Sequence, residues 1–87
     1  MSEQTLRELV DRLKQEVDGL PAQEVETRDR LNGIIADLEG QLEAPAMQQS
    51  QGLTGNIQDT IHELEVRHPD ATTVLNNIMM TLANMGI

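Results

Sequence analysis

The sequence predicts an all-α protein in which four helices form two helical hairpins and pack as one small helical bundle, either alone or completed by dimerisation. Apolar residues recur at intervals of three and four in four successive segments, which is the spacing that aligns side chains on one face of a helix. Glycine and proline occur at the boundaries between these segments, where they favour turns. With 87 residues and no cysteine, the chain has material for one core, so we treat residues 1–87 as a single domain.

The first predicted helix covers residues 3–17, with Ser2 as its cap. Its apolar face consists of Leu6, Leu9, Val10, Leu13 and Val17. Asp18 and Gly19 are expected to end it, because glycine suits the left-handed position that follows a last helical turn. Pro21 is expected to start the next helix, because its fixed φ suits a first helical position.

The second predicted helix covers residues 22–43. Its apolar residues repeat at helical spacing: Leu31, Ile34, Ile35, Leu38 and Leu42. Gly33 and Gly40 lie inside it, and each costs about 1 kcal/mol relative to alanine in a helix interior. They either mark the close approach of a neighbouring helix or lie on an exposed side, and the sequence leaves both interpretations open.

A linker and a third helix follow. Residues 44–52 are rich in glutamine and are predicted to be a flexible linker. The third helix is predicted over residues 53–68, with its apolar face made of Leu53, Ile57, Ile61 and Leu64. Pro69 disfavours helical geometry in the residue before it, so we expect the helix to end at His68 and the next to follow with almost no loop.

The fourth predicted helix, residues 70–85, is the one on which the rest of the prediction depends. Ala71, Leu75, Ile78, Leu82 and Met85 form its apolar stripe, widened by Val74 and Met79. No charged residue occurs from Ala71 to the end of the chain, although the outer face of a solvated helix usually carries charge. We therefore expect a central helix whose neutral back is lightly solvated or covered by a second copy. The candidate interface residues are Val74, Asn77, Met79, Met80, Thr81 and Asn84.

Acidic and basic residues lie four apart on the other helices, in the order that stabilises a helix when the acid comes first. The predicted pairs are Glu3 with Arg7, Glu8 with Arg12, Glu24 with Arg28, Glu26 with Arg30, and Glu63 with Arg67. Acids interleaved with arginine in this way are typical of a solvated helix face rather than of a catalytic site.

The net charge of −9 limits the classes of molecule that the protein can bind. Residues 1–43 carry eleven acidic and five basic residues, so the first hairpin alone has a net charge of −6. Such a surface repels phosphate, so we expect no nucleic acid and no membrane partner, whereas a basic partner protein is compatible. The absence of an aromatic residue also disfavours base stacking and planar cofactors. No signal-peptide or membrane-span pattern is visible, and we expect a cytoplasmic protein without disulfides.

Few residues are candidates for metal binding or catalysis. His62 and His68 are the only histidines, and six residues apart on a helix they point about 120° away from each other. Each histidine lies three residues from Glu65, and a histidine and a glutamate at this spacing can form half of a carboxylate-bridged metal site. No matching second motif is visible in the sequence. We expect His68 to help end its helix and His62 to lie on the polar side. The prediction is no metal, no cofactor, no catalytic residue and no enzyme activity.

The C-terminal residues resemble a known family. His68 and Pro69, followed by a leucine-containing helix that closes on Met85, Gly86 and Ile87, are similar to the ending of the short bacterial proteins grouped as domain-of-unknown-function family 4404. Further similar positions are Leu6, Leu9, Leu13, Glu26, Thr27, Arg28, Leu31, Ala36, Asp37 and Leu38. Because this family has no assigned activity, the resemblance implies a helical fold and a bacterial origin, and it transfers no functional residue.

Two functions from different classes remain. The first is a helical interaction module that self-associates as a dimer through the neutral face of the last helix. The second is an acidic regulator that occupies a basic protein surface, indicated by the charge of the first hairpin.

Overall fold

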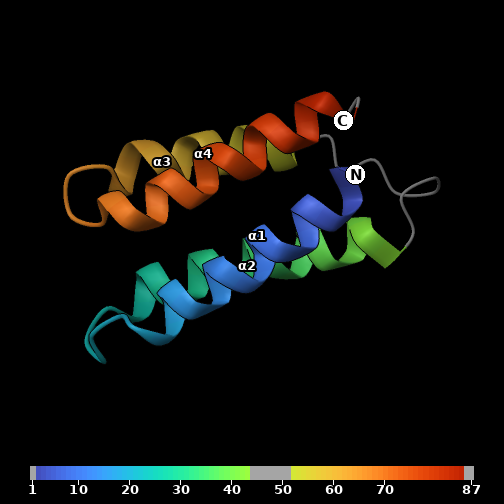
Figure 1. Ribbon diagram of the computed structural model, residues 1–87. Coiled ribbons are helices and arrows are strands. Elements are labelled where there is room, and N and C mark those ends of the chain that lie inside the picture. The colour runs from blue at the N-terminus through green and yellow to red at the C-terminus, as the bar shows by residue number, and fades with distance from the viewer. Residues whose placement is uncertain (1, 44–51, 86–87) are drawn as a thin grey trace.

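A computed structural model describes residues 2–43 and 52–85, and within these ranges the chain forms four α-helices and no strand (Figure 1). The helices are α1 (Ser2–Asp18), α2 (Val25–Glu43), α3 (Leu53–Leu64) and α4 (Pro69–Asn84). The predicted all-α fold of two helical hairpins is confirmed. The predicted linker lies outside the described residues except for Gly52, which precedes α3.

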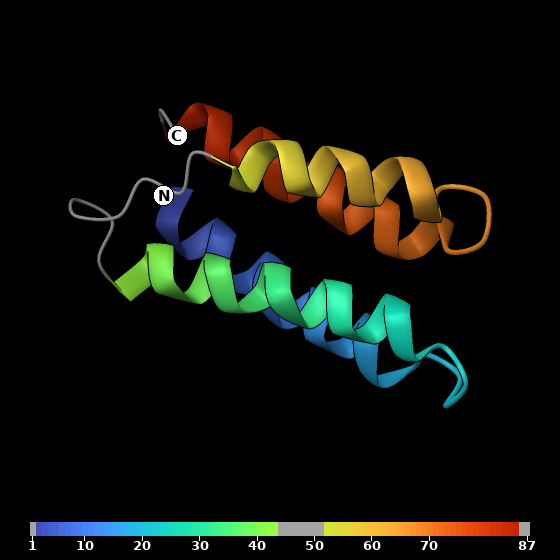
Figure 2. The same ribbon diagram turned by 180° about the vertical axis from the view of Figure 1, so that it is seen from behind.

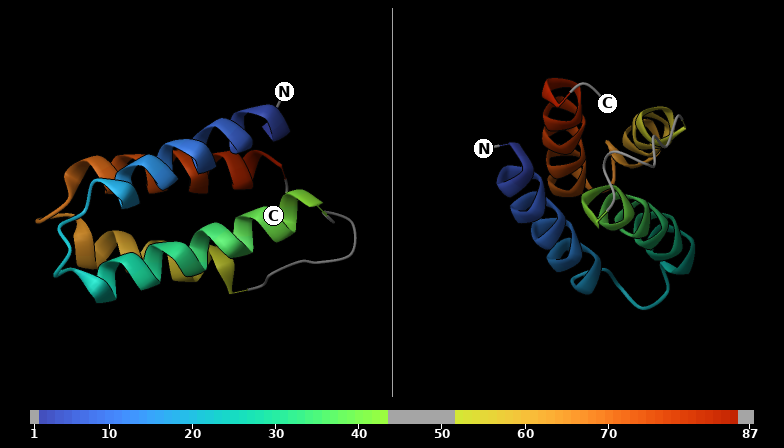
Figure 3. Two further views of the ribbon diagram at one scale, coloured as in Figure 1. Left: turned by 90° about the horizontal axis from the view of Figure 1, so that it is seen from below. Right: turned by 90° about the vertical axis from the view of Figure 1, so that its right-hand side faces the viewer.

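Consecutive helices run antiparallel, so the α1–α2 and α3–α4 turns lie at the same end of the bundle (Figures 1 and 2). We call this end the turn end. Helix α4 contacts both α1 and α3, while α2 contacts α1 closely and α3 more sparsely (Figure 3). The resulting bundle measures 37 × 20 × 20 Å. The two hairpins are therefore joined mainly through α1 and α4.

A single aliphatic core draws on all four helices. Its buried members are Leu6, Val10, Leu13, Val17, Leu31, Ile34, Ile35, Leu38, Leu53, Ile57, Leu64, Val74, Leu75, Ile78 and Leu82. Helix α4 contributes Leu75, Ile78 and Leu82 with no exposed surface. Because these three lie at helical spacing in the predicted stripe, the prediction that this stripe is buried in the core is confirmed.

Helix α2 begins at Val25 and not at residue 22, so the prediction that Pro21 opens it is wrong. The backbone N–H of Glu24 donates to Pro21 O at 3.0 Å, which closes a turn, and the first helical bond runs from Arg28 N–H to Glu24 O at 3.1 Å. The Glu24 side chain is held by the α3–α4 turn, as described below. Gly19 is also not left-handed, because its φ lies outside the left-handed region; its N–H donates to Gln15 O at 3.1 Å.

Helix α3 ends at Leu64 and not at His68, so the expectation of almost no loop is also wrong. Residues 65–67 form a turn, and the N–H of His68 closes it on Leu64 O at 2.7 Å. His68 itself has φ −138° and ψ 68°, which confirms that Pro69 excludes helical geometry from the residue before it. Pro69 is then the first residue of α4.

Gly33 lies on the exposed side of α2. A Cβ atom added there would meet nothing within 4 Å, so no neighbouring helix requires the missing side chain. Of the two interpretations left open by the sequence, the exposed one holds for this glycine.

We predict that Gly33→Ala stabilises the protein by about 1 kcal/mol, because alanine restricts the unfolded backbone and no atom obstructs its methyl group. Urea unfolding followed by circular dichroism measures the change. The matched control is Ala36→Gly on the same exposed face, which should cost a similar amount. A loss of stability for Gly33→Ala would show that α2 is covered at this position.

Candidate functional site

After Asp70 in its first turn, the outward side of α4 carries no charged side chain. Its exposed residues are Thr73, Asn76, Asn77, Met80, Ala83 and Asn84, which we call the α4 outer face. They fall in one arc of the helix, opposite the buried stripe. Met80 lies at the centre of this arc with 59% of its surface exposed. In the described part of the chain, only Val25 and Val66 are comparably large and exposed apolar residues, and both lie at the turn end.

The structure separates the six candidate interface residues into two groups. Asn77, Met80 and Asn84 are exposed and belong to the α4 outer face. Met79 is half-buried, whereas Val74 and Thr81 are only 6% and 8% exposed. Val74 and Thr81 therefore pack inside the single chain, and the surface open to a second copy is narrower than the sequence predicted.

Thr81, which the sequence predicts as an interface residue of the neutral back, is instead buried within the chain. Its hydroxyl donates to Asn77 O one turn earlier, at 2.9 Å, so the polar group is satisfied within the helix. A threonine paired in this way can be buried with its methyl group against the core. Thr60 of α3 does the same with Asn56 O at 2.8 Å and is fully buried.

A groove of about 370 Å³ runs along the α1 side of the α4 outer face. Arg12 and Glu16 of α1 line it, opposite Asp70, Thr73 and Asn77 of α4, and the edge of Val74 forms part of its wall. The uncharged surface is thus bordered by a row of charged groups on α1. On this side of the bundle, the uncharged surface therefore does not extend beyond α4 onto α1.

In place of their predicted partners four residues away, Arg28, Arg30 and Arg67 contact other parts of the chain. Arg30 of α2 donates to Thr60 Oγ1 at 2.8 Å and to Glu63 Oε2 at 2.7 Å, both on α3. Arg28 donates to Leu20 O in the α1–α2 turn at 3.2 Å. By contrast, the predicted pair of Glu3 and Arg7 is present at 3.0 Å. The sparse contact between α2 and α3 is therefore reinforced by polar bonds.

Glu24 is the centre of a polar cluster at the turn end. Its side chain is only 10% exposed and accepts hydrogen bonds from Arg67 and from His68, whose Nε2 lies 2.8 Å from Glu24 Oε2. The cluster ties the α1–α2 turn to the α3–α4 turn, which fixes the end of one hairpin on the other. Sequence spacing could not reveal it, because the partners are more than 40 residues apart.

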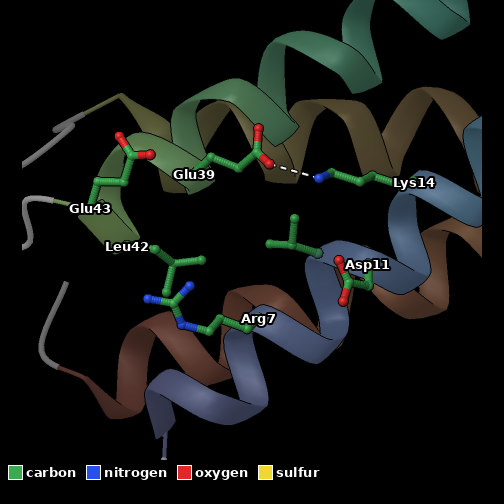
Figure 4. Close-up of a pocket in the computed structure, with 7 residues that line it drawn as sticks. Arg7, Asp11, Lys14, Glu39, Leu42 and Glu43 are labelled. Atoms are coloured by element: carbon green, nitrogen blue, oxygen red, sulfur yellow. Dashed lines mark hydrogen bonds and ion pairs between the residues drawn. The ribbon is translucent and has the colours of Figure 1, made fainter.

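A second groove, of about 240 Å³, lies between α1 and α2 (Figure 4). Lys14 of α1 reaches across it to Glu39 of α2 at 2.7 Å. This hydrogen bond, with the attraction of the same carboxylate, raises the pKa of Lys14. Arg7, the other base at the groove, is paired with Glu3. Both cations are thus already neutralised by acids of the same chain.

Neither histidine lies in a metal-binding arrangement. His62 is 82% exposed and its Nδ1 is 3.9 Å from Glu65, on the polar side as expected. His68 binds Glu24 as described above. Across residues 2–43 and 52–85, no group of three or more histidine, aspartate or glutamate side chains is arranged to hold a metal ion.

These observations define a small antiparallel four-helix bundle that presents helix faces and shallow grooves to its surroundings. The model of the family described as Domain of unknown function (DUF4404) matches residues 6–87, so the chain belongs to this family, as the resemblance predicted. Comparison with curated proteins and with solved structures gives no match. None of the described helices has the length and apolar character needed to cross a membrane.

We predict that Glu24→Gln destabilises the protein by about 1–3 kcal/mol, because it removes the charge that Arg67 and His68 share at a nearly buried position. Urea unfolding gives the change from the shift of the midpoint. Glu26→Gln is the matched control, because Glu26 is exposed and its neutralisation should change stability by less than about 0.5 kcal/mol. Equal effects of the two substitutions would contradict a structural role for the cluster.

Proposed function

We propose that this protein is a helical interaction module that self-associates as a dimer through the α4 outer face. The observation that carries the proposal is the exposure of Met80 at the centre of a helix face without charge. The proposal assigns the protein a binding role in the cytoplasm, with no catalytic step, cofactor, nucleic acid or membrane.

Electrostatics favours this face over the others. Two copies of a chain with net charge −9 repel each other, and the repulsion is strongest where acids face acids. The exposed residues of α1 and α2 include many acids, whereas α4 carries none after Asp70. A contact between copies costs least where neither surface brings a charge, which favours the α4 outer face.

The composition of the face also supports this role. Interface cores are depleted of charged residues and enriched in methionine, whose flexible side chain adapts to an uneven partner surface. The surrounding asparagines can exchange hydrogen bonds with a partner instead of with water. With 16 residues, α4 is about 24 Å long, so a face one helix wide, roughly 10 Å, covers only about 240 Å², compared with roughly 800 Å² per partner in a typical interface. We therefore expect weak, concentration-dependent association.

Met80→Glu should raise the dimer dissociation constant at least about tenfold, or about 1.4 kcal/mol, because it places a charge from each copy at the centre of the contact. Sedimentation equilibrium over a range of protein concentrations measures this, and circular dichroism should show an unchanged helix content. Asn32→Glu on the exposed side of α2 adds the same charge and should leave association nearly unchanged. A wild-type protein that stays monomeric at 9.7 kDa across the range would refute the proposal.

One observation favours the alternative of an acidic regulator that binds a basic protein. The guanidinium groups of Arg28 and Arg30 turn toward the α1–α2 turn and toward α3. The outward side of α2 is thereby left with exposed acids: Glu26, Asp29, Asp37, Glu39 and Glu43. Of these, Glu39 is paired with Lys14. A basic partner surface would find there a helix side whose exposed charged residues are all acidic.

For this alternative, we expect a basic partner captured from lysate to be lost at high salt, because exposed charge pairs are screened. The double variant Asp29→Asn with Asp37→Asn should lose the same partner at low salt, whereas Met80→Gln should retain it. Self-association through α4 would show the reverse pattern, since it persists in salt and does not depend on the acids of α2. Capture that is unaffected by salt and by the asparagine substitutions would remove the alternative.

A further inference from the structure

We propose that the two α4 helices of the dimer pack antiparallel across a twofold axis that passes close to Met80. The occupant of the α4 outer face is then a second copy of this chain, with its α4 running in the opposite direction. This inference rests on the proposed function and adds the orientation of the two copies.

The first argument comes from the arrangement of the face itself. A twofold contact must be complementary to itself, because the same residues occur on both sides. Asn76 lies four residues before Met80 and Asn84 lies four residues after it, and all three are exposed. In an antiparallel pair centred on Met80, Asn76 of each copy therefore faces Asn84 of the other. An amide side chain both donates and accepts, so two such side chains can satisfy each other.

The second argument is the charge at the start of the helix. Asp70 is exposed in the first turn of α4, at the edge of the outer face beside Thr73 and Asn77. A parallel pair places the two Asp70 carboxylates next to each other. An antiparallel pair centred on Met80 separates them by about 30 Å, from a rise of 1.5 Å per residue, which is well beyond the screening length of about 8 Å. The antiparallel orientation thus avoids the one charge repulsion that α4 could create.

The third argument is the size of the central side chains. Met80 is the only large apolar residue exposed on the described length of α4. Centring the axis on it brings the two methionines against each other, so each removes the other from water. Ala83 lies one turn away on the same face and leaves room for the partner helix. A register that moves the axis away from Met80 sets this side chain against a smaller residue of the face, such as Asn77 or Ala83, instead.

Cysteine crosslinking tests the orientation directly, because the chain contains no cysteine and a single substitution gives a unique thiol. Under mild oxidation, Met80→Cys should form a disulfide-linked dimer. Asn76→Cys alone and Asn84→Cys alone should not, because each thiol then lies about 12 Å along the helix from its copy, beyond the roughly 7 Å between Cα atoms that a disulfide spans. An equal mixture of these two variants should crosslink as a heterodimer, identified by mass spectrometry.

Asn32→Cys on α2 is the control for random collision at the same protein concentration. Self-crosslinking of Asn76→Cys and Asn84→Cys as fast as Met80→Cys would overturn the antiparallel orientation while leaving the proposed dimer intact. If the protein sediments as a dimer but no α4 variant crosslinks faster than Asn32→Cys, both the orientation and the proposed surface are refuted. A protein that sediments as a monomer refutes the proposed function itself.

Discussion

The packing of one face of α4 against α1 and α3 is the constraint on which the structure depends. A two-helix hairpin has too little apolar surface to be stable alone, so the two hairpins must share a core. Without aromatic residues this core is aliphatic, and Leu75, Ile78 and Leu82 of α4 are completely buried in it. The same packing holds α4 in one rotation about its axis. Its opposite side is thereby presented to solvent as a fixed surface.

Apolar burial is not directional, so the alignment of the hairpins needs a second set of contacts. Polar bonds between α2 and α3, and between the two turns at the turn end, provide this second set of contacts. Arg30 reaches both Thr60 and Glu63, and Glu24 binds Arg67 and His68 at the turn end. Because hydrogen bonds lose strength when their geometry changes, these contacts penalise any sliding or opening of α2 along α3. One side of the bundle is thus held by close helix packing, and on the other side polar bonds add to the shared apolar core.

Sequence periodicity predicted the parts of this arrangement that are local. The four helices and the buried stripes of α1 and α4 follow from residues three and four apart, and His68 is non-helical before Pro69 as expected. Contacts between distant segments could not be found this way. Glu24 could have paired with Arg28 four residues later, yet its partners come from the α3–α4 turn, and this also sets the start of α2. The burial of Thr81 was missed for a different reason: its hydroxyl donates to a carbonyl of its own helix, which lowers the cost of burying this polar residue.

The lack of charge on the α4 outer face is a feature that the folding of one chain does not require. An exposed helix side tolerates acids and bases, and α1 uses the pair of Glu3 and Arg7 there. Such a pair stabilises an isolated helix by only about 0.2–0.5 kcal/mol, but neither member can enter an interface without losing its hydration. The asparagines, threonine and methionine of the α4 outer face do not form such stabilising ion pairs. Their side chains can, however, be removed from water at a lower free-energy cost than charged ones. A surface of this kind is explained more readily by contact with a second protein surface than by contact with water, which is why the proposal places the dimer there.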